Sequence, residues 1–206
     1  MRRVLFLMTI VALALSGPQA AFAGKTSTVD PALMQPPLNP TFAPWECWRA
    51  GDSIICEGSD TGTYNGLEVD FLACDGGPVF SAGTYSASAR RVGDADGLAL
   101  TTTFRDSYVE WFSANPDGSG IRLRSTGQRK NVFTYSDPGN PETVSLSTIG
   151  VDIRVTGPGL GVLMQDVGHT TWNSDGNLVK SAGSHITEES FAESHAKICE
   201  ALDLEG

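Results

Sequence analysis

Residues 151–159 read Val-Asp-Ile-Arg-Val-Thr-Gly-Pro-Gly, and this stretch decides the class of fold. Val151, Ile153 and Val155 alternate with charged residues, so one row of side chains is apolar and the other is polar. A period of two predicts a β-strand with one buried and one solvated face, as in an antiparallel sheet. The Gly-Pro-Gly that follows predicts a tight turn, which returns the chain alongside the strand.

The same pattern of strand-like runs and turn residues continues toward both ends of the chain. Short runs rich in Val, Ile, Thr, Tyr and Phe alternate with clusters of Gly, Asp, Asn and Pro, which is typical of strands joined by tight turns. The predicted strands cover residues 53–57, 66–73, 83–92, 98–105, 108–114, 121–126, 131–135, 143–156, 160–172 and 177–186. The sequence therefore predicts an all-β fold, an antiparallel meander barrel of about eight to ten strands, because closure removes the sheet edges. A two-sheet β-sandwich is the alternative.

The N-terminus indicates export. Arg2 and Arg3 precede an apolar run from Val4 to Leu15, and small residues lead up to Ala23. This order predicts a signal peptide over residues 1–23, and the apolar run is too short for a membrane anchor. The proline-rich residues 24–44 are then expected to be a disordered linker, and residues 45–206 a single secreted, extracellular domain.

The four cysteines predict two disulfides in such an exported chain. Gly51-Asp52 is a good two-residue hairpin turn, and in that register Cys47 lies directly opposite Cys56. This pairing leaves Cys74 with Cys199. The cysteine spacings match no zinc motif, so no metal is expected there.

Only the C-terminal residues 187–203 predict a helix. Thr187 suits the N-cap position, and Phe191, Ile198 and Leu202 form an apolar stripe. Cys199 lies on the same stripe. The helix is therefore expected to pack on the sheet and to be tied there through Cys74.

Composition and motifs exclude several functions. The formal net charge is −10, so phosphate backbones and anionic lipid headgroups are repelled, and neither nucleic acid nor a membrane surface is an expected partner. The chain has no phosphate-binding glycine loop, dinucleotide fingerprint, nucleophile elbow or zinc-protease motif, so no cofactor is expected.

The last predicted hairpin supplies the candidate catalytic residues. With Asp175-Gly176 as its turn, Asp166 faces His185, and His169 lies three residues beyond Asp166. These residue types transfer protons or bind metals, whereas a structural Asp–His hydrogen bond is the alternative. Pairing through the turn at 157–159 predicts His169 inside the barrel, with Asp166 and His185 outside.

Two further groups of side chains are candidate binding elements. One is a local basic patch that suits an acidic cell-wall polymer or a carboxylate ligand, or else is a solvated strand face: Arg122, Arg124, Arg129 and Lys130. The other is a set of aromatics that line a ligand cavity or fill the core: Tyr85, Phe104, Tyr108, Trp111, Phe112 and Trp172.

The segments 159–169, 172–177 and 181–185 resemble the last hairpin of small exported bacterial β-barrel proteins of unassigned function. The paired-cysteine hairpin near the start and the cysteine in a closing helix are also similar. More distantly, the chain resembles calycin and allene oxide cyclase-type barrels, which bind or transform apolar small molecules in the barrel mouth. That resemblance implies a cavity and transfers no catalytic residue.

Two functions follow as hypotheses. The first is a non-catalytic binding or interaction module, with an apolar small molecule or a cell-envelope component as its partner. The second is a cyclase- or isomerase-like enzyme that acts on an apolar molecule with His169 as acid or base. A hollow interior beside a histidine favours the enzyme, and a filled interior favours a surface interaction.

Overall fold

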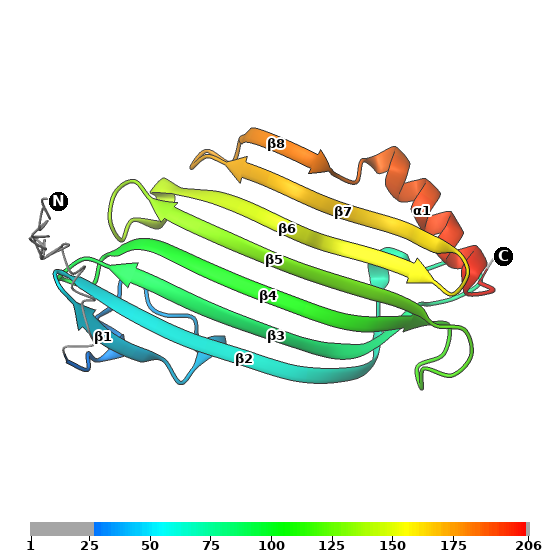
Figure 1. Ribbon diagram of the computed structural model, residues 1–206, viewed down its shortest axis with the longest axis horizontal. Coiled ribbons are helices and arrows are strands. Elements are labelled where there is room, and N and C mark those ends of the chain that lie inside the picture. Colours follow the sequence, from blue (N-terminus) through cyan, green and yellow to red (C-terminus); the bar gives the residue numbers. More distant parts are fainter. Residues whose placement is uncertain (1–26, 205–206) are drawn as a thin grey trace, which may run out of the picture.

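Eight strands form one antiparallel sheet in which each strand pairs with the next along the chain (Figure 1). This computed structural model describes residues 27–204, so the predicted signal peptide lies outside the described residues. The strands are β1 (Glu46–Ala50), β2 (Ser53–Glu68), β3 (Phe80–Gly93), β4 (Ala99–Ser113), β5 (Leu123–Tyr135), β6 (Val144–Gly157), β7 (Gly161–Trp172) and β8 (Leu178–Ser184). The helices are the 3-10 turns η1 (Pro31–Leu33), η2 (Pro40–Phe42), η3 (Asp70–Leu72) and η4 (Pro141–Thr143), and the α-helix α1 (Glu188–Ala201).

The all-β meander and the C-terminal helix are confirmed, but the sheet does not close. Strands β1 and β8 do not pair with each other and form its two edges. The edges are protected by other means than the predicted barrel closure. Thr28 bridges Trp48 along β1, β8 is short and carries Lys180, and α1 lies beside β7.

Several predicted strands are halves of longer ones. The predicted strands 98–105 and 108–114 are joined in the continuous strand β4 (99–113), and the predicted strands 121–126 and 131–135 are joined in β5 (123–135). Residues 66–73 form no strand of their own, since β2 runs to Glu68 and η3 follows. The polar residues between these runs lie in mid-strand rather than in turns.

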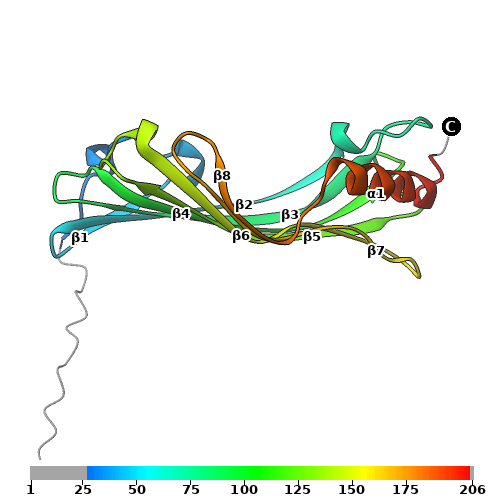
Figure 2. The ribbon, with the colours of Figure 1, turned by 90° about the horizontal axis from the view of Figure 1, so that it is seen from above.

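Two separate hydrophobic cores lie at opposite ends of one face of the sheet, which we call the covered face. Figure 2 shows the N-terminal segment and α1 on the same side of the curved sheet, one at each end. The N-terminal core contains Val29, Met34, Cys47, Ile54 and Cys56. The helix-side core contains Val69, Leu72, Val79, Phe112, Leu123, Val155, Met164, Ile198 and Leu202. The opposite face, which we call the open face, carries neither segment.

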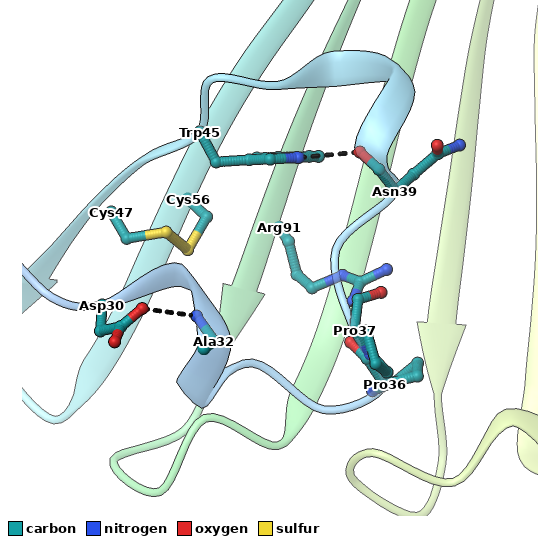
Figure 3. The surroundings of a disulfide bond; sticks show 9 residues. All are labelled: Asp30, Ala32, Pro36, Pro37, Asn39, Trp45, Cys47, Cys56 and Arg91. Carbon is teal, nitrogen blue, oxygen red and sulfur yellow. Dashed lines mark hydrogen bonds between the residues drawn. A yellow bond between two sulfur atoms is a disulfide. The ribbon is translucent and has the colours of Figure 1, made fainter.

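Residues 27–44 are a packed part of the fold, in contrast to the disordered linker that their composition predicts. Met34 is only 1% exposed, and the buried guanidinium of Arg91 donates to the carbonyls of Pro36 and Pro37 (Figure 3). The indole Nε1 of Trp45 donates to the carbonyl of Asn39 at 2.9 Å. The prolines that suggested a linker restrict the unfolded chain, so ordering this segment costs less entropy.

Both disulfides form as predicted. Cys47 and Cys56 are cross-strand partners of β1 and β2, with Cα atoms 4.1 Å apart (Figure 3). Cys74 and Cys199 join the segment after η3 to α1 across 125 residues of sequence. The second bridge therefore holds the helix on the sheet, as its apolar stripe also does.

Helix α1 begins one residue after Thr187, whose side chain accepts from the backbone N–H of Ser190 at 3.2 Å. Its predicted cap is thus confirmed, and Ile198 and Cys199 are buried. Among the described residues, no helix is long and apolar enough to cross a membrane.

A β-bulge at Asp152 breaks the alternation that residues 151–155 suggest. Val151 pairs with Val167 but Ile153 pairs with Asp166, so the register shifts between them. Val155 is buried in the helix-side core, whereas Val151 lines a hollow of the open face. The prediction that Val151, Ile153 and Val155 share one face is wrong, because the extra residue reverses the pleat.

Candidate functional site

The middle of the covered face lies between the two cores and forms a polar trough. Two adjoining hollows make up the trough, and Arg129 lines both. The larger is about 590 Å³ and is bounded on one side by Asn39 and Phe42 of the N-terminal segment. The smaller is about 270 Å³ and extends over β6 and β7 to His185. The trough thus crosses the strands.

Three tyrosines with fixed hydroxyl groups line the larger hollow. The hydroxyl of Tyr64 donates to Glu110 Oε2 at 2.7 Å, and that of Tyr85 donates to Asp60 Oδ2 at 2.9 Å. The hydroxyl of Tyr108 donates to the carbonyl oxygen of Asp152 at 2.8 Å. These bonds orient the rings and leave carboxylate oxygens beside them.

Two of these rings occupy space that is free only because a glycine lies opposite them on the neighbouring strand. A Cβ at Gly62 would lie 2.5 Å from the ring of Tyr85, and a Cβ at Gly127 would collide with the ring of Tyr108. Each ring therefore lies against the backbone of a strand that has no side chain there. Tyr85 remains 37% exposed, so its ring is available to a ligand.

All three phenols are held in the protonated state. Burial and then the hydrogen bond to Glu110 raise the pKa of Tyr64. The bond to Asp60 raises the pKa of Tyr85, and burial raises the pKa of Tyr108 to about 12. The trough therefore presents neutral aromatic rings and hydroxyl groups at physiological pH.

Arg129 lies at the junction of the two hollows. Its Nε donates to Asp106 Oδ2 at 2.9 Å, and its Nη1 donates to Asp152 Oδ1. Burial opposes the charge of this guanidinium, but Asp106 and then Asp152 outweigh burial and raise the pKa of Arg129. A charged bridge thus spans β4, β5 and β6 across the floor of the trough.

Asp166 and His185 lie in the smaller hollow and form the contact that the hairpin register predicts. His185 Nδ1 is 3.0 Å from Asp166 Oδ1, and its Nε2 is 3.3 Å from the carbonyl oxygen of Ala182. The second carboxylate oxygen of Asp166 accepts from the backbone N–H of Ile186 at 3.2 Å. The pair joins β7 to the chain that leads into α1, which fits the structural alternative for these residues.

His169 lies on the open face, away from Asp166 and His185. Its Nε2 is 2.9 Å from Ser147 Oγ and 3.3 Å from Thr171 Oγ1. The predicted placement of His169 inside and Asp166 and His185 outside is reversed, because the bulge at Asp152 exchanges the two faces. The structure brings two of these residues together and leaves the third on the opposite face.

The predicted basic patch is divided between the faces. Arg129 belongs to the trough, whereas Arg124 and Lys130 alternate with it on β5 and lie on the open face. Arg122 stacks over Trp111, with its guanidinium carbon 5.6 Å from the ring centroid.

The aromatic candidates also separate. Tyr85, Phe104 and Tyr108 line the trough, and Phe112 is in the helix-side core. Trp111 and Trp172 are 40% and 38% exposed.

Sequence reasoning missed the acidic side chains of the trough, which are Asp60, Asp106, Glu110 and Asp152. Their signal is the polar centre of strands that are apolar at both ends, such as Arg105-Asp106-Ser107 in β4. A run of polar residues has the composition of a turn, so it is read as a break between two strands. Here the run lies in mid-strand, because the centre of the strand faces the trough instead of a hydrophobic core.

Comparison with protein families, curated proteins and solved structures finds no match for this chain. The resemblance to exported bacterial barrels and to calycin-type barrels stays a prediction.

Proposed function

We propose that this protein is an exported, disulfide-stabilised, non-catalytic binding module whose trough holds a hydroxyl-rich ligand, of which a linear oligosaccharide is the chemical type. One observation carries the proposal. Across the middle of the covered face, ring faces and fixed hydrogen-bonding groups lie side by side in two adjoining hollows that join at Arg129.

The chemistry of the trough favours a polyhydroxylated molecule. The face of an aromatic ring carries partial negative charge and attracts the C–H groups of a sugar, while carboxylates accept from its hydroxyl groups. Asp60 and Glu110 place carboxylates beside Tyr85 and Tyr64 in this way. The trough also has more acidic than basic side chains, and this excess disfavours an anionic ligand.

An apolar small molecule fits the trough less well. Sites for such molecules enclose most of the ligand in apolar walls. Here the floor includes the ion pair of Arg129 with Asp106, and Asp166 and His185 line the smaller hollow. A ligand without hydroxyl groups would cover these charges and leave their hydrogen-bonding capacity unmet.

The cyclase- or isomerase-like alternative has weaker support. His169 lies on the open face, away from both hollows. Both oxygens of Asp166 and both nitrogens of His185 are within hydrogen-bonding distance of groups of the fold itself. The pair therefore reads as a structural contact that borders the ligand site.

Binding is tested by isothermal titration of the purified protein with linear neutral oligosaccharides of increasing length. At least one series is expected to bind. Tyr85→Ala removes one exposed ring and is expected to weaken binding about three- to tenfold. Trp111→Ala is the matched control, since it removes an exposed aromatic ring from the other face.

Equal affinities for the Tyr85→Ala and Trp111→Ala variants would contradict the assignment of the trough. The export part of the proposal is tested separately, by N-terminal sequencing of the protein collected outside the cytoplasm. We expect its first residue to be Gly24.

A further inference from the structure

The open face carries a compact set of donor side chains at the centre of the sheet. They come from β3, β4 and β5 and form two adjacent cross-strand rows, in which residues of one row are directly opposite each other. The rows are Ser88, Arg105 and Lys130, and Ser86, Ser107 and Gln128. We call these six residues the donor lattice.

The donor lattice has no partners within the fold. All six side chains are exposed, and none makes a hydrogen bond or ion pair with any residue from 27 to 204. All are donors, and no carboxylate is among them. The two rows line a hollow of about 460 Å³, together with Ile149 and Val151.

The like charges of Arg105 and Lys130 repel each other in the protein without a ligand. They are direct cross-strand partners on β4 and β5, and like charges in that position destabilise a sheet. No acidic side chain of the described residues forms an ion pair with either. An anion from outside the chain would remove the repulsion and gain charge-assisted hydrogen bonds.

Further cations lie on the open face around the donor lattice. Arg124, Arg154 and Lys180 follow from the alternation of β5, β6 and β8, and Arg90 lies 3.6 Å from Glu57 on the adjacent strand. The acidic side chains of the trough are on the other side of the sheet. Two carboxylates border the donor lattice on its own face, since Glu46 and Glu57 line a neighbouring hollow with Ser88, Arg90 and Arg105. The donor lattice itself holds two cations, Arg105 and Lys130, and no carboxylate.

We infer that the open face binds a linear acidic polysaccharide, with the donor lattice as the seat for its carboxylates and hydroxyl groups. The planar fork of Arg105 suits a carboxylate, and Lys130 adds a second charge beside it. The three serines and Gln128 supply neutral donors and acceptors for hydroxyl groups. A linear polymer can then continue over the other cations of the face.

The test uses biolayer interferometry of the purified protein on immobilised polygalacturonate, a linear polymer of uronic acid. The wild-type protein is expected to bind, more weakly as salt rises. Lys130→Gln is expected to weaken binding about tenfold, because a hydrogen bond to a charged group is lost. Lys197→Gln is the matched control, since it removes the same charge from an exposed position on α1, and Lys130→Arg is expected to retain binding.

Three results would overturn the inference: no binding by the wild-type protein, equal loss in the Lys130→Gln and Lys197→Gln variants, or tighter binding to duplex DNA than to polygalacturonate. The Tyr85→Ala variant separates the two faces. It is expected to bind polygalacturonate like the wild type, even though it loses affinity in the trough.

Discussion

At the scale of single residues, the trough depends on glycine and tyrosine at matching positions of neighbouring strands. Gly127 accommodates the ring of Tyr108, and Gly62 accommodates that of Tyr85. The two sites differ in what surrounds them. A Cβ at Gly127 would also lie 2.6 Å from the backbone oxygen of Asp152, whereas a Cβ at Gly62 would meet only the far end of the Tyr85 side chain.

This difference predicts unequal effects for two identical substitutions. Gly127→Ala is expected to cost about 1–3 kcal/mol of unfolding free energy, because backbone has to move to admit the methyl group. Gly62→Ala is expected to cost less, since the exposed ring of Tyr85 swings away from Asp60. Urea unfolding of both variants checks the order, and a larger loss at Gly62 would contradict it.

The half-buried phenol of Tyr108 predicts a loss of stability at alkaline pH. Its pKa is about 12 in the folded protein and about 10 in an unfolded chain. Between these values the folded state keeps a proton that the unfolded state loses, so stability is complete below about pH 10 and falls as the pH rises toward about 12. Urea midpoints measured from pH 8 upward should therefore decline above about pH 10.

The Tyr108→Phe variant isolates this contribution. It should lose about 1 kcal/mol at neutral pH, with the hydrogen bond to the carbonyl of Asp152. Its stability should then fall less steeply with pH than that of the wild type. Equal slopes for the two proteins would show that Tyr108 does not carry the effect.

At the scale of elements, the two disulfides close loops of very different length. Cys47 and Cys56 are 9 residues apart in sequence, and Cys74 and Cys199 are 125 apart. The chain-entropy relation then gives about 2.5 kcal/mol for the first bridge and about 5 kcal/mol for the second. The longer bridge is therefore the larger contributor to stability.

The comparison of two double variants tests this difference. Replacing Cys74 and Cys199 by alanine is expected to lower the urea midpoint more than replacing Cys47 and Cys56 by alanine. The reverse order would show that the hairpin bridge, which lies in the N-terminal core, acts mainly through packing.

Comparison of the predicted elements with the structure shows which features of the fold can be predicted from the sequence. Turn signals, the cysteine register at Cys47 and Cys56, and the cap at Thr187 are local, and the structure confirms them. The continuity of β4 through residues 105–108 cannot be predicted from the sequence pattern, because the centre of that strand faces a polar trough instead of a hydrophobic core. Closure of the sheet and the packing of residues 27–44 depend on contacts between distant segments, which periodicity does not encode.

The candidate site follows the same division. The Asp166–His185 contact lies within one hairpin and follows from the position of its turn. The bridge from Arg129 to Asp106 and Asp152 joins three strands, and its geometry depends on a bulge that the sequence does not mark. Side chains separated by several strand pairings were therefore beyond a reading of the sequence.

At the scale of the whole molecule, the two cores share a sheet but not a hydrophobic interior. The N-terminal core and the helix-side core have no buried residue in common, and the polar trough lies between them. Each core thus stabilises its own end of the strands, and the middle of the sheet is joined by backbone hydrogen bonds and by polar contacts such as the ion pair of Arg129 with Asp106.

This separation predicts local unfolding of one end. Ile198→Ala creates a cavity in the helix-side core, at a cost of about 2–5 kcal/mol. Hydrogen exchange measured by mass spectrometry should become faster in α1 and stay unchanged in residues 29–47. Equally faster exchange in both regions would show that the ends unfold as a single cooperative unit.

Because the trough crosses the strands, its extent sets the length of ligand that the protein can contact. A ligand that extends from Asp60 on β2 to Asp166 on β7 passes over five inter-strand steps, or about 24 Å at the usual spacing of about 4.8 Å. The strand residues that line the two hollows come from β2 to β7, and His185 also lines the smaller one, so a longer chain extends past the trough and gains no further contacts there. Affinity should therefore rise with the length of the bound chain until it reaches this span and then level off. The number of strands that the trough crosses therefore determines the preferred length of the ligand, independently of the individual side-chain contacts.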